Sequence, residues 1–190
     1  MTAMPVKQAV TADEFMARPL SDETRFLELV EGELVMFDPD ARHNLVQGNL
    51  FGALRAWTRA AEGRGRLYLP LDVLMDQRNV FEPDISWYRQ GRAPSAGDPR
   101  PYDVPDLAAE VRSPSTWRYD VGAKKSVYER RGLPELWLVD TLAEQVLVFR
   151  RSAPKADRFD ASLELDRGEA LESPLLPGFA LLLDELFDLD

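Results

Sequence analysis

The sequence predicts a mixed α/β (α+β) fold in which a central mixed β-sheet is flanked by α-helices. Two pairs of apolar runs are each separated by a short turn, which is typical of β-hairpins. Residues 43–61 carry apolar side chains at helical spacing. Residues 107–111 form an apolar run without alternation, which indicates a strand buried on both faces. Strands and helices are therefore mixed along the chain, and 190 residues fit one domain over residues 1–190.

The first third of the chain is predicted to form a short helix, an N-terminal β-hairpin and a long helix. Thr11 and Glu14 form a capping box that starts the short helix. The hairpin pairs residues 26–30 with residues 34–37 around a tight turn. The long helix runs from residue 43 to residue 61 and ends near a glycine.

The middle of the chain contains the elements on which the functional argument depends. We expect strands at residues 66–75, interrupted by Pro70, and at residues 79–88, with Pro83 marking an irregular entry. Residues 90–102 are rich in Pro, Gly and Arg and are predicted to be a loop. The buried strand 107–111 follows this loop.

The remaining elements complete the predicted sheet. Asp120 is expected to cap a helix over residues 121–131, which Gly132 and Pro134 close. Residues 135–140 and 145–150 form the second predicted hairpin. A further strand is expected at residues 159–165 and a short terminal helix at residues 181–187.

Composition limits the kinds of metal site that the chain can build. It has no cysteine, which excludes disulfides and thiolate metal sites. Its one histidine, His43, excludes a zinc site made of several imidazoles. Any metal would therefore be held by oxygen, which favours Mg²⁺, Mn²⁺ or Ca²⁺.

The sequence is expected to be that of a cytoplasmic protein that does not enter a membrane. Residues 1–10 contain one lysine and no long apolar stretch, so they do not resemble a signal peptide. No segment approaches the roughly 20 apolar residues that are needed to span a bilayer.

The net charge of −10 argues against a passive nucleic-acid binder, because Lys and Arg supply most non-specific affinity for phosphate. A nuclease remains compatible with this charge, since a bound cation offsets an acidic metal site. The positive charge is unevenly spread, and solvated surface is the simpler explanation for its clusters. One cluster consists of Arg55, Arg59, Arg64 and Arg66.

Two carboxylates and a lysine form the pattern that carries chemistry. Asp84 precedes an apolar strand, and Glu110 lies near the end of another. Lys124 follows on the first turn of the predicted helix, with Tyr128 four residues later on the same face. If the two strands are neighbours, both carboxylates converge at one end of the sheet. Carboxylates that hold Mg²⁺, beside a lysine that orients or deprotonates water, suit metal-assisted cleavage of a phosphodiester.

Each of these residues also has a structural explanation when it is taken alone. Asp84 would be a turn residue and Lys124 a solvated side chain, whereas Glu110 needs a partner because it ends an apolar strand. Asp106 and Asp120 are better explained as a turn residue and a helix cap. Trp117 lies between Glu110 and Lys124, where it either packs in the turn or stacks on a base.

The combined pattern, from about residue 11 to residue 183, resembles the Uma-type putative restriction endonuclease family, within the PD-(D/E)XK nuclease superfamily. The matching stretches are Leu27–Glu33, His43 at the start of a helix, Glu82–Ile85, Pro105–Leu107, Glu110–Ser115, Asp120, Lys124, Tyr128 and Gly132–Asp140. The resemblance implies a restriction-endonuclease-like core.

The resemblance also implies roles for individual residues. Asp84 and Glu110 would be ligands of Mg²⁺ or Mn²⁺, and Lys124 the catalytic lysine, moved from its usual place onto the helix. Arg112 stands where the superfamily usually has that lysine; an arginine stays protonated and cannot be a general base. Glu33 would be an additional ligand or would orient water.

His43 would bind phosphate or move a proton, because its pKa is easily tuned. Glu28, on the same strand pair as Glu33, has a weaker case. A strand residue that faces solvent and a structural histidine are the alternatives for Glu33 and His43.

The leading hypothesis is therefore a metal-dependent DNA endonuclease. The first alternative is a non-catalytic interaction module that keeps the fold, which the acidic composition favours. The second is a metal-dependent phosphoesterase on a small substrate, because no long basic groove is evident. A homodimer is also possible, since residues 175–183 are apolar and would either form an interface or close the core.

Overall fold

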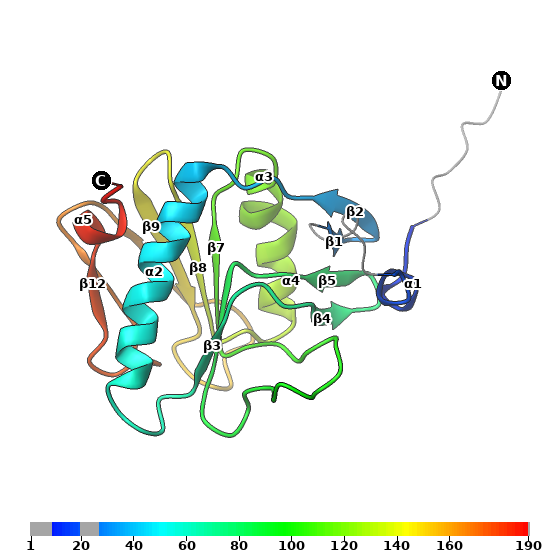
Figure 1. Ribbon diagram of the computed structural model, residues 1–190, viewed down its shortest axis with the longest axis horizontal. Coiled ribbons are helices and arrows are strands. Elements are labelled where there is room, and N and C mark those ends of the chain that lie inside the picture. The colour runs from blue at the N-terminus through cyan, green and yellow to red at the C-terminus, as the bar shows by residue number, and fades with distance from the viewer. Residues whose placement is uncertain (1–8, 20–26, 190) are drawn as a thin grey trace.

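The computed structural model describes residues 9–19 and 27–189 (Figure 1). Phe26, the predicted first residue of the N-terminal hairpin, lies outside the described residues, as does most of the N-terminal segment 1–10.

A six-stranded sheet forms the centre of the fold. Its strand order is β10-β9-β8-β7-β6-β3, and β7 and β8 are parallel while the other neighbours are antiparallel. The strands are β3 (Arg66–Tyr68), β6 (Ile85–Tyr88), β7 (Leu107–Val111), β8 (Glu135–Asp140), β9 (Gln145–Arg150) and β10 (Ala161–Leu165). This mixed sheet, with helices packed against it, confirms the predicted fold class.

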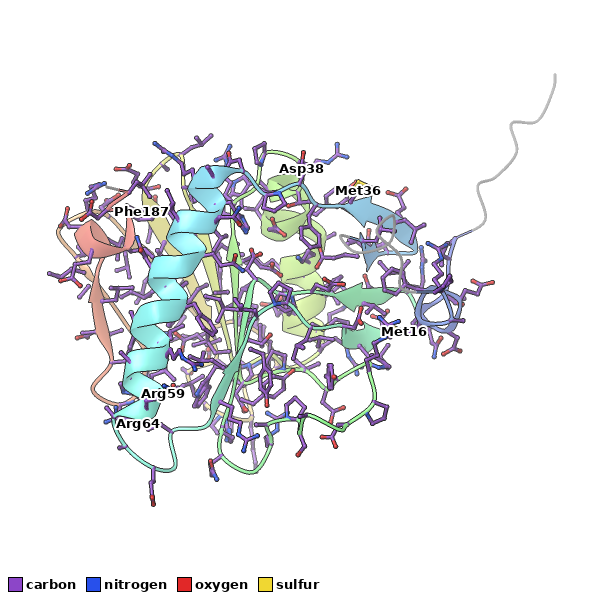
Figure 2. The ribbon with its side chains drawn as sticks, viewed as in Figure 1. Met16, Met36, Asp38, Arg59, Arg64 and Phe187 are labelled. Carbon is purple, nitrogen blue, oxygen red and sulfur yellow. The ribbon has the colours of Figure 1, made fainter. Side chains whose placement is uncertain are left out.

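The helix α2 (Ala41–Arg59) covers one face of this sheet (Figure 1). Figure 2 shows it running from just beyond Asp38 to Arg59. Its buried residues, such as Val46 and Leu50, pack against alternate residues of β7 and β8. The apolar stretch 175–183 enters the same core through side chains such as Leu176 and Phe179, so it closes the core.

The opposite face of the sheet packs against a helical segment and a second, smaller sheet. That sheet has the order β2-β1-β5-β4, and its strands are β1 (Leu27–Val30), β2 (Glu33–Met36), β4 (Val73–Asp76) and β5 (Asn79–Phe81). The predicted hairpin is confirmed as β1 and β2. Its turn residues Glu31 and Gly32 have φ angles of 52° and 84°, as a type I′ turn requires. The capping box at Thr11 is also present and starts α1 (Ala12–Met16).

Two predicted strands are each divided between the two sheets. The segment expected as one strand over residues 66–75 forms β3 and β4, and the segment 79–88 forms β5 and β6. Pro70 and Pro83 lie in the breaks, because proline cannot donate the hydrogen bond that a continuous strand needs. The chain therefore crosses from the small sheet to the large one at residues 82–84.

The helix expected over residues 121–131 starts earlier and is not regular. It consists of α3 (Trp117–Tyr119), a π-helical turn (Asp120–Lys124) and α4 (Lys125–Arg130). Asp120 is therefore inside the helical segment and is not its cap, and Lys124 is not on the first turn. Single π-helical turns within α-helices are frequent at functional sites.

The C-terminal part also differs from expectation in one element. Leu181 and Leu182, expected in the terminal helix, instead belong to β12 (Ala180–Leu182), which pairs with β11 (Ala170–Glu172). The helix that follows, α5, is limited to Leu183–Leu186. In the described part of the chain, no helix combines the length and the apolar character that crossing a bilayer requires.

Gly65 offers a test of how α2 is joined to the sheet. Its φ is +73°, and a Cβ atom there would lie 2.1 Å from the carbonyl oxygen of Tyr88. We expect Gly65→Ala to lower the free energy of unfolding by about 2–4 kcal/mol, because it combines backbone strain with a clash against backbone. Gly63→Ala is the matched control, since Gly63 has a φ of +78° and open space around it. Urea denaturation should show a loss of only about 1 kcal/mol for the control, and equal losses would contradict this packing.

Candidate active site

A buried lysine lies at the centre of a group of carboxylates. Lys124 is 2% exposed. Its Nζ atom lies 2.8 Å from Glu110 Oε1, 2.9 Å from Glu28 Oε1 and 3.2 Å from Asp120 Oδ1. All three acids are themselves buried. A single ammonium group therefore compensates three carboxylates that have little contact with water.

These four side chains come from three separate parts of the fold. Glu28 is on β1 of the small sheet, and Glu110 is on β7 of the large sheet. Asp120 and Lys124 lie four residues apart at the two ends of the π-helical turn. That helical segment connects the parallel strands β7 and β8, and it thereby brings Lys124 back to the strand that carries Glu110.

Tyr128 holds the other side of Glu110. Its hydroxyl donates a hydrogen bond to Glu110 Oε1 at 2.6 Å, and the tyrosine is fully buried. The structure therefore brings Tyr128 to the site as a partner of Glu110.

Asp84 is fixed at the point where the chain enters the large sheet. Its Oδ2 atom accepts a hydrogen bond of 2.7 Å from the backbone N–H of Val111, and its backbone carbonyl accepts one of 2.9 Å from Gln47. His43 Nε2 lies 3.2 Å from Asp84 Oδ1. His43 is on the first turn of α2, where its backbone N–H is capped by Asp40.

A narrow cavity joins the two predicted metal ligands. The space that the centre of a water molecule can occupy in it is about 10 Å³, which is close to the minimum needed to hold one water. The cavity contains both Asp84 and Glu110. It is lined by Glu28, Phe37, His43, Glu82, Asp84, Glu110, Val111, Ser113, Thr116, Asp120 and Lys124.

Burial and mutual repulsion set the proton affinity of this group. Burial raises the pKa of Glu28, Glu110 and Asp120, and the positive charge of Lys124 opposes the rise. Burial alone would lower the pKa of Lys124, but Glu110, Glu28 and Asp120 raise it well above its ordinary value. Lys124 is therefore held in its protonated form.

Two further groups in the cavity have shifted proton affinities. Burial, with the nearby charges of Asp72 and Glu28, raises the pKa of Glu82 to about 8. Burial opposes the charged form of His43, but its hydrogen bond to Asp84 and the charge of that carboxylate outweigh this effect and raise the pKa of His43.

The donor atoms around the cavity are those that a hard divalent cation prefers. Carboxylate oxygens from several acids line it, and the chain has no cysteine. Within residues 9–19 and 27–189, however, no group of three or more acidic or histidine side chains is already arranged around an ion position. The positive charge at the centre is supplied by Lys124 Nζ. The oxygen donors of these residues thus suit an ion such as Mg²⁺. To bind it, some of the carboxylates that now contact Lys124 would have to rotate away from the ammonium group.

Several residues singled out in the sequence lie elsewhere. Glu33 is exposed on β2 and does not line the cavity. Arg112 pairs with Asp140 at 2.8 Å, and its guanidinium lies 5.5 Å from the centroid of the Trp117 ring. Trp117 therefore packs beside an arginine. Asp106, expected to be a turn residue, is buried and ion-paired, as described below.

Two members of the group were missed or ranked low from the sequence. Asp120 was assigned to a helix cap, and Glu28 was given a weaker case than Glu33. A signal for Glu28 does exist, because it stands inside the apolar run Leu27–Val30, where a buried charge needs a partner. Glu82 carries the same kind of signal beside Phe81.

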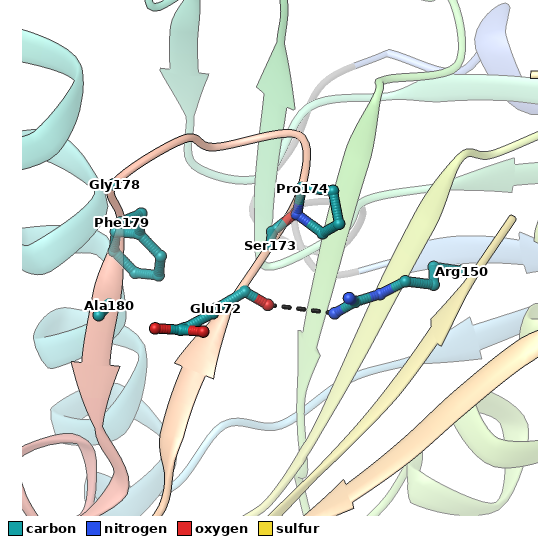
Figure 3. Close-up of a pocket in the computed structure, with 7 residues that line it drawn as sticks. All are labelled: Arg150, Glu172, Ser173, Pro174, Gly178, Phe179 and Ala180. Carbon is teal, nitrogen blue, oxygen red and sulfur yellow. Dashed lines mark hydrogen bonds between the residues drawn. The ribbon is translucent and has the colours of Figure 1, made fainter. Parts of the chain in front are cut away.

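A wider pocket lies near the start of β8 (Figure 3). It has a volume of about 500 Å³ and includes Arg150, whose Nη2 atom donates to the carbonyl of Glu172 at 3.1 Å. Glu135, 3.3 Å from the same atom, also accepts hydrogen bonds from Trp137 and Ser173. This pocket has no counterpart of the acid–lysine group, so its size alone does not make it the reaction site.

Comparison with known proteins places this chain in a family. No curated protein matches the chain. The fold is similar to a crystal structure from Anabaena variabilis ATCC 29413 that is described as "a putative nuclease belonging to DUF820", with a TM-score of 0.76 and 21% sequence identity. The match covers 94% of this chain and 97% of that chain. Residues 12–184 match the model of the family Uma2, described as "Putative restriction endonuclease". The chain therefore belongs to the Uma2 family.

Proposed function

We propose that this protein is a metal-dependent DNA endonuclease that hydrolyses phosphodiester bonds at the cavity around Lys124. The observation that carries the proposal is the convergence of Asp84, Glu110 and Lys124 on one buried cavity from three separate elements. Buried acids beside a buried lysine are costly to a fold, and such groups concentrate at functional sites. The family description adds nucleic acid as the substrate class.

Asp84 and Glu110 would hold Mg²⁺ or Mn²⁺. Both carboxylates are oriented by neighbours, Asp84 by the N–H of Val111 and by His43, and Glu110 by the hydroxyl of Tyr128. Such partners fix ligand geometry and tune affinity. When bound, a divalent ion supplies a Lewis acid that withdraws charge from a phosphoryl oxygen and makes water a better nucleophile.

Lys124 would position the attacking water and stabilise negative charge on the phosphate. In the metal-free cluster its neighbours keep it protonated, so it acts there as a hydrogen-bond donor and a positive charge. With a second cation beside the same acids, the proton of Lys124 becomes easier to lose, and the amine can then accept a proton from water. The water oxygen bonds to phosphorus as the bond from phosphorus to the leaving oxygen breaks.

The remaining residues support this arrangement. His43 orients Asp84 through Nε2, and Glu28 and Asp120 hold the Lys124 side chain in place. Glu33 is left out of the proposed site, because it is exposed on β2.

A non-catalytic module that retains the nuclease fold is the second candidate. One observation favours it: Lys124 already compensates the acids, and the cavity is small. A module of this kind would need neither the metal nor a reactive lysine. Cleavage and metal binding therefore separate the two candidates.

One prediction of this proposal concerns the metal ligands. Asp84→Asn combined with Glu110→Gln should abolish calorimetric binding of Mn²⁺ and reduce plasmid cleavage by roughly 100-fold or more, because a catalytic metal contributes several kcal/mol to the transition state. Glu33→Gln is the matched control and should bind Mn²⁺ and cleave as the wild type does. Full activity in the double variant would rule out this site. Activity on a small phosphodiester with none on DNA would move the assignment to a small-substrate phosphoesterase.

A further prediction of this proposal concerns the charge of Lys124. Lys124→Met should lower the free energy of unfolding by about 3–5 kcal/mol at pH 8, because it leaves three buried carboxylates without their cation. Those acids have raised pKa values in the folded state, so the folded protein binds protons more tightly than the unfolded chain. Their contribution is therefore most favourable at low pH and is lost as the pH rises. The loss in the variant should accordingly be smaller at pH 5 than at pH 8.

Urea denaturation at the two pH values measures this difference. Lys125→Met serves as the control, since Lys125 is only partly buried and lies 4.3 Å from the centroid of the Phe149 ring. We expect a loss of at most about 1 kcal/mol for the control. A loss for Lys124→Met that is equally small, or that does not depend on pH, would mean that the lysine does not neutralise the acids.

A further inference from the structure

Arginines gather at the end of the molecule where α2 and β6 terminate. Arg55 and Arg59 are four residues apart on the last turns of α2, so they share a helical face. Figure 2 shows Arg59 and Arg64 at the same end of this helix. We call this group the arginine end, and it consists of Arg55, Arg59, Arg64, Arg66, Arg89 and Arg92.

Hydrogen bonds and strand pairing hold the arginine end in place. The carbonyl of Arg64 accepts a hydrogen bond from Trp87 Nε1, and Arg64 Nη1 donates to the carbonyl of Trp57, both at 2.8 Å. The guanidinium of Arg64 also lies 4.6 Å from the centroid of the Trp57 ring. Arg66 stands opposite Tyr88 in the pairing of β3 with β6. These contacts connect the loop after α2 to the sheet.

Most of this positive charge is not neutralised. Arg89 and Arg92 share one buried carboxylate, that of Asp106, at 2.7 and 2.6 Å. Arg55, Arg59 and Arg66 are exposed, and none of them takes part in an ion pair within the described ranges. Residues 55–66 contain a single acid, Glu62. This end is therefore positive although the chain has a net charge of −10.

An open pocket lies within the arginine end. Its volume is about 530 Å³, and its lining includes Arg64, Arg89, Glu62, Trp57 and Trp87. The pocket thus combines apolar side chains with two guanidinium groups and one carboxylate, so its side chains carry a net positive charge. A sugar–phosphate strand is complementary to such a pocket, because its phosphates are anionic and its sugars are less polar.

The reaction centre itself cannot supply affinity for a polyanion. Its cavity is lined by five carboxylates, and the basic side chains in the lining are those of Lys124 and His43. Since contacts between cations and phosphates provide most of the affinity of proteins for DNA, a substrate must find its cations elsewhere. Arg59 follows His43 by 16 residues on one continuous helix, which is about 24 Å along the axis. That distance corresponds to roughly seven base pairs.

We propose that the arginine end is a phosphate-binding surface that contacts the backbone of a DNA duplex at a distance from the reaction centre. The proposal rests on the proposed function only in taking DNA as the substrate. It assigns Arg59 and Arg66 to binding and not to the chemical step.

Fluorescence anisotropy of a labelled 30-base-pair duplex in EDTA tests this directly. Arg59→Glu combined with Arg66→Glu should weaken binding about tenfold or more at 0.1 M NaCl, and should reduce the slope of log Kd against log salt by about two. Lys155→Glu combined with Arg158→Glu changes the net charge equally, at exposed residues before β10. This control should stay within about threefold of the wild type with the same slope. Equal weakening of both variants, or no weakening of either, would overturn the proposal.

Two further readouts separate this proposal from others. Sedimentation velocity that shows loss of self-association in Arg59→Glu/Arg66→Glu, with DNA binding intact, would assign the surface to a second copy of the chain and overturn the proposal. With Mn²⁺, the same variant should show a raised KM for cleavage and an unchanged kcat. If the wild-type protein binds DNA through these arginines but does not cut it, the proposed nuclease function is wrong and the binding surface stands. If Arg59→Glu/Arg66→Glu cleaves DNA with an unchanged KM, the nuclease function stands and the binding surface is wrong.

Discussion

The contact of Lys124 with Glu28, Glu110 and Asp120 is the interaction on which this structure depends. Three buried carboxylates from two sheets and a helix would repel one another without the ammonium group between them. These acids belong to β1, β7 and the π-helical turn. Because each of them is attracted to Lys124, the cluster also joins the small sheet to the large one. The centre is therefore a structural element as well as a candidate site of reaction.

This arrangement explains why stability and chemistry are coupled here. A buried network of charges contributes little net stability compared with an apolar core, but removing its only strong cation is costly. A divalent ion bound by Asp84 and Glu110 would take over part of the compensation that Lys124 now provides. The same acidic centre would repel a DNA backbone, which gives the distant arginines a role that the centre cannot fill. Opposite charges are thus divided between the two ends of α2.

The sequence predicted the fold class and much of the element order, because those depend on local patterns. The hairpin of β1 and β2, the helix α2 and the buried strand β7 follow from turn residues, helical spacing and a continuous apolar run. Long-range placement was harder to predict. Glu28 and Glu33 lie on the same pair of strands, and alternation alone does not say that Glu28 faces Lys124 while Glu33 lies exposed beside the turn. Aspartate is a preferred N-cap residue, so a helix cap was expected at Asp120, whereas the π-helical turn found there departs from the regular helical period.

A crystal structure with Mn²⁺, located by its anomalous scattering, would show whether Asp84 and Glu110 hold a metal. We expect one strong anomalous peak within bonding distance of carboxylate oxygens of both Asp84 and Glu110, with Lys124 Nζ moved from its position beside Glu110. The proposed metal site would be contradicted if, at saturating Mn²⁺, Lys124 stays in place and the ion either binds elsewhere or does not bind. In that case the buried cluster would be a structural ion network alone.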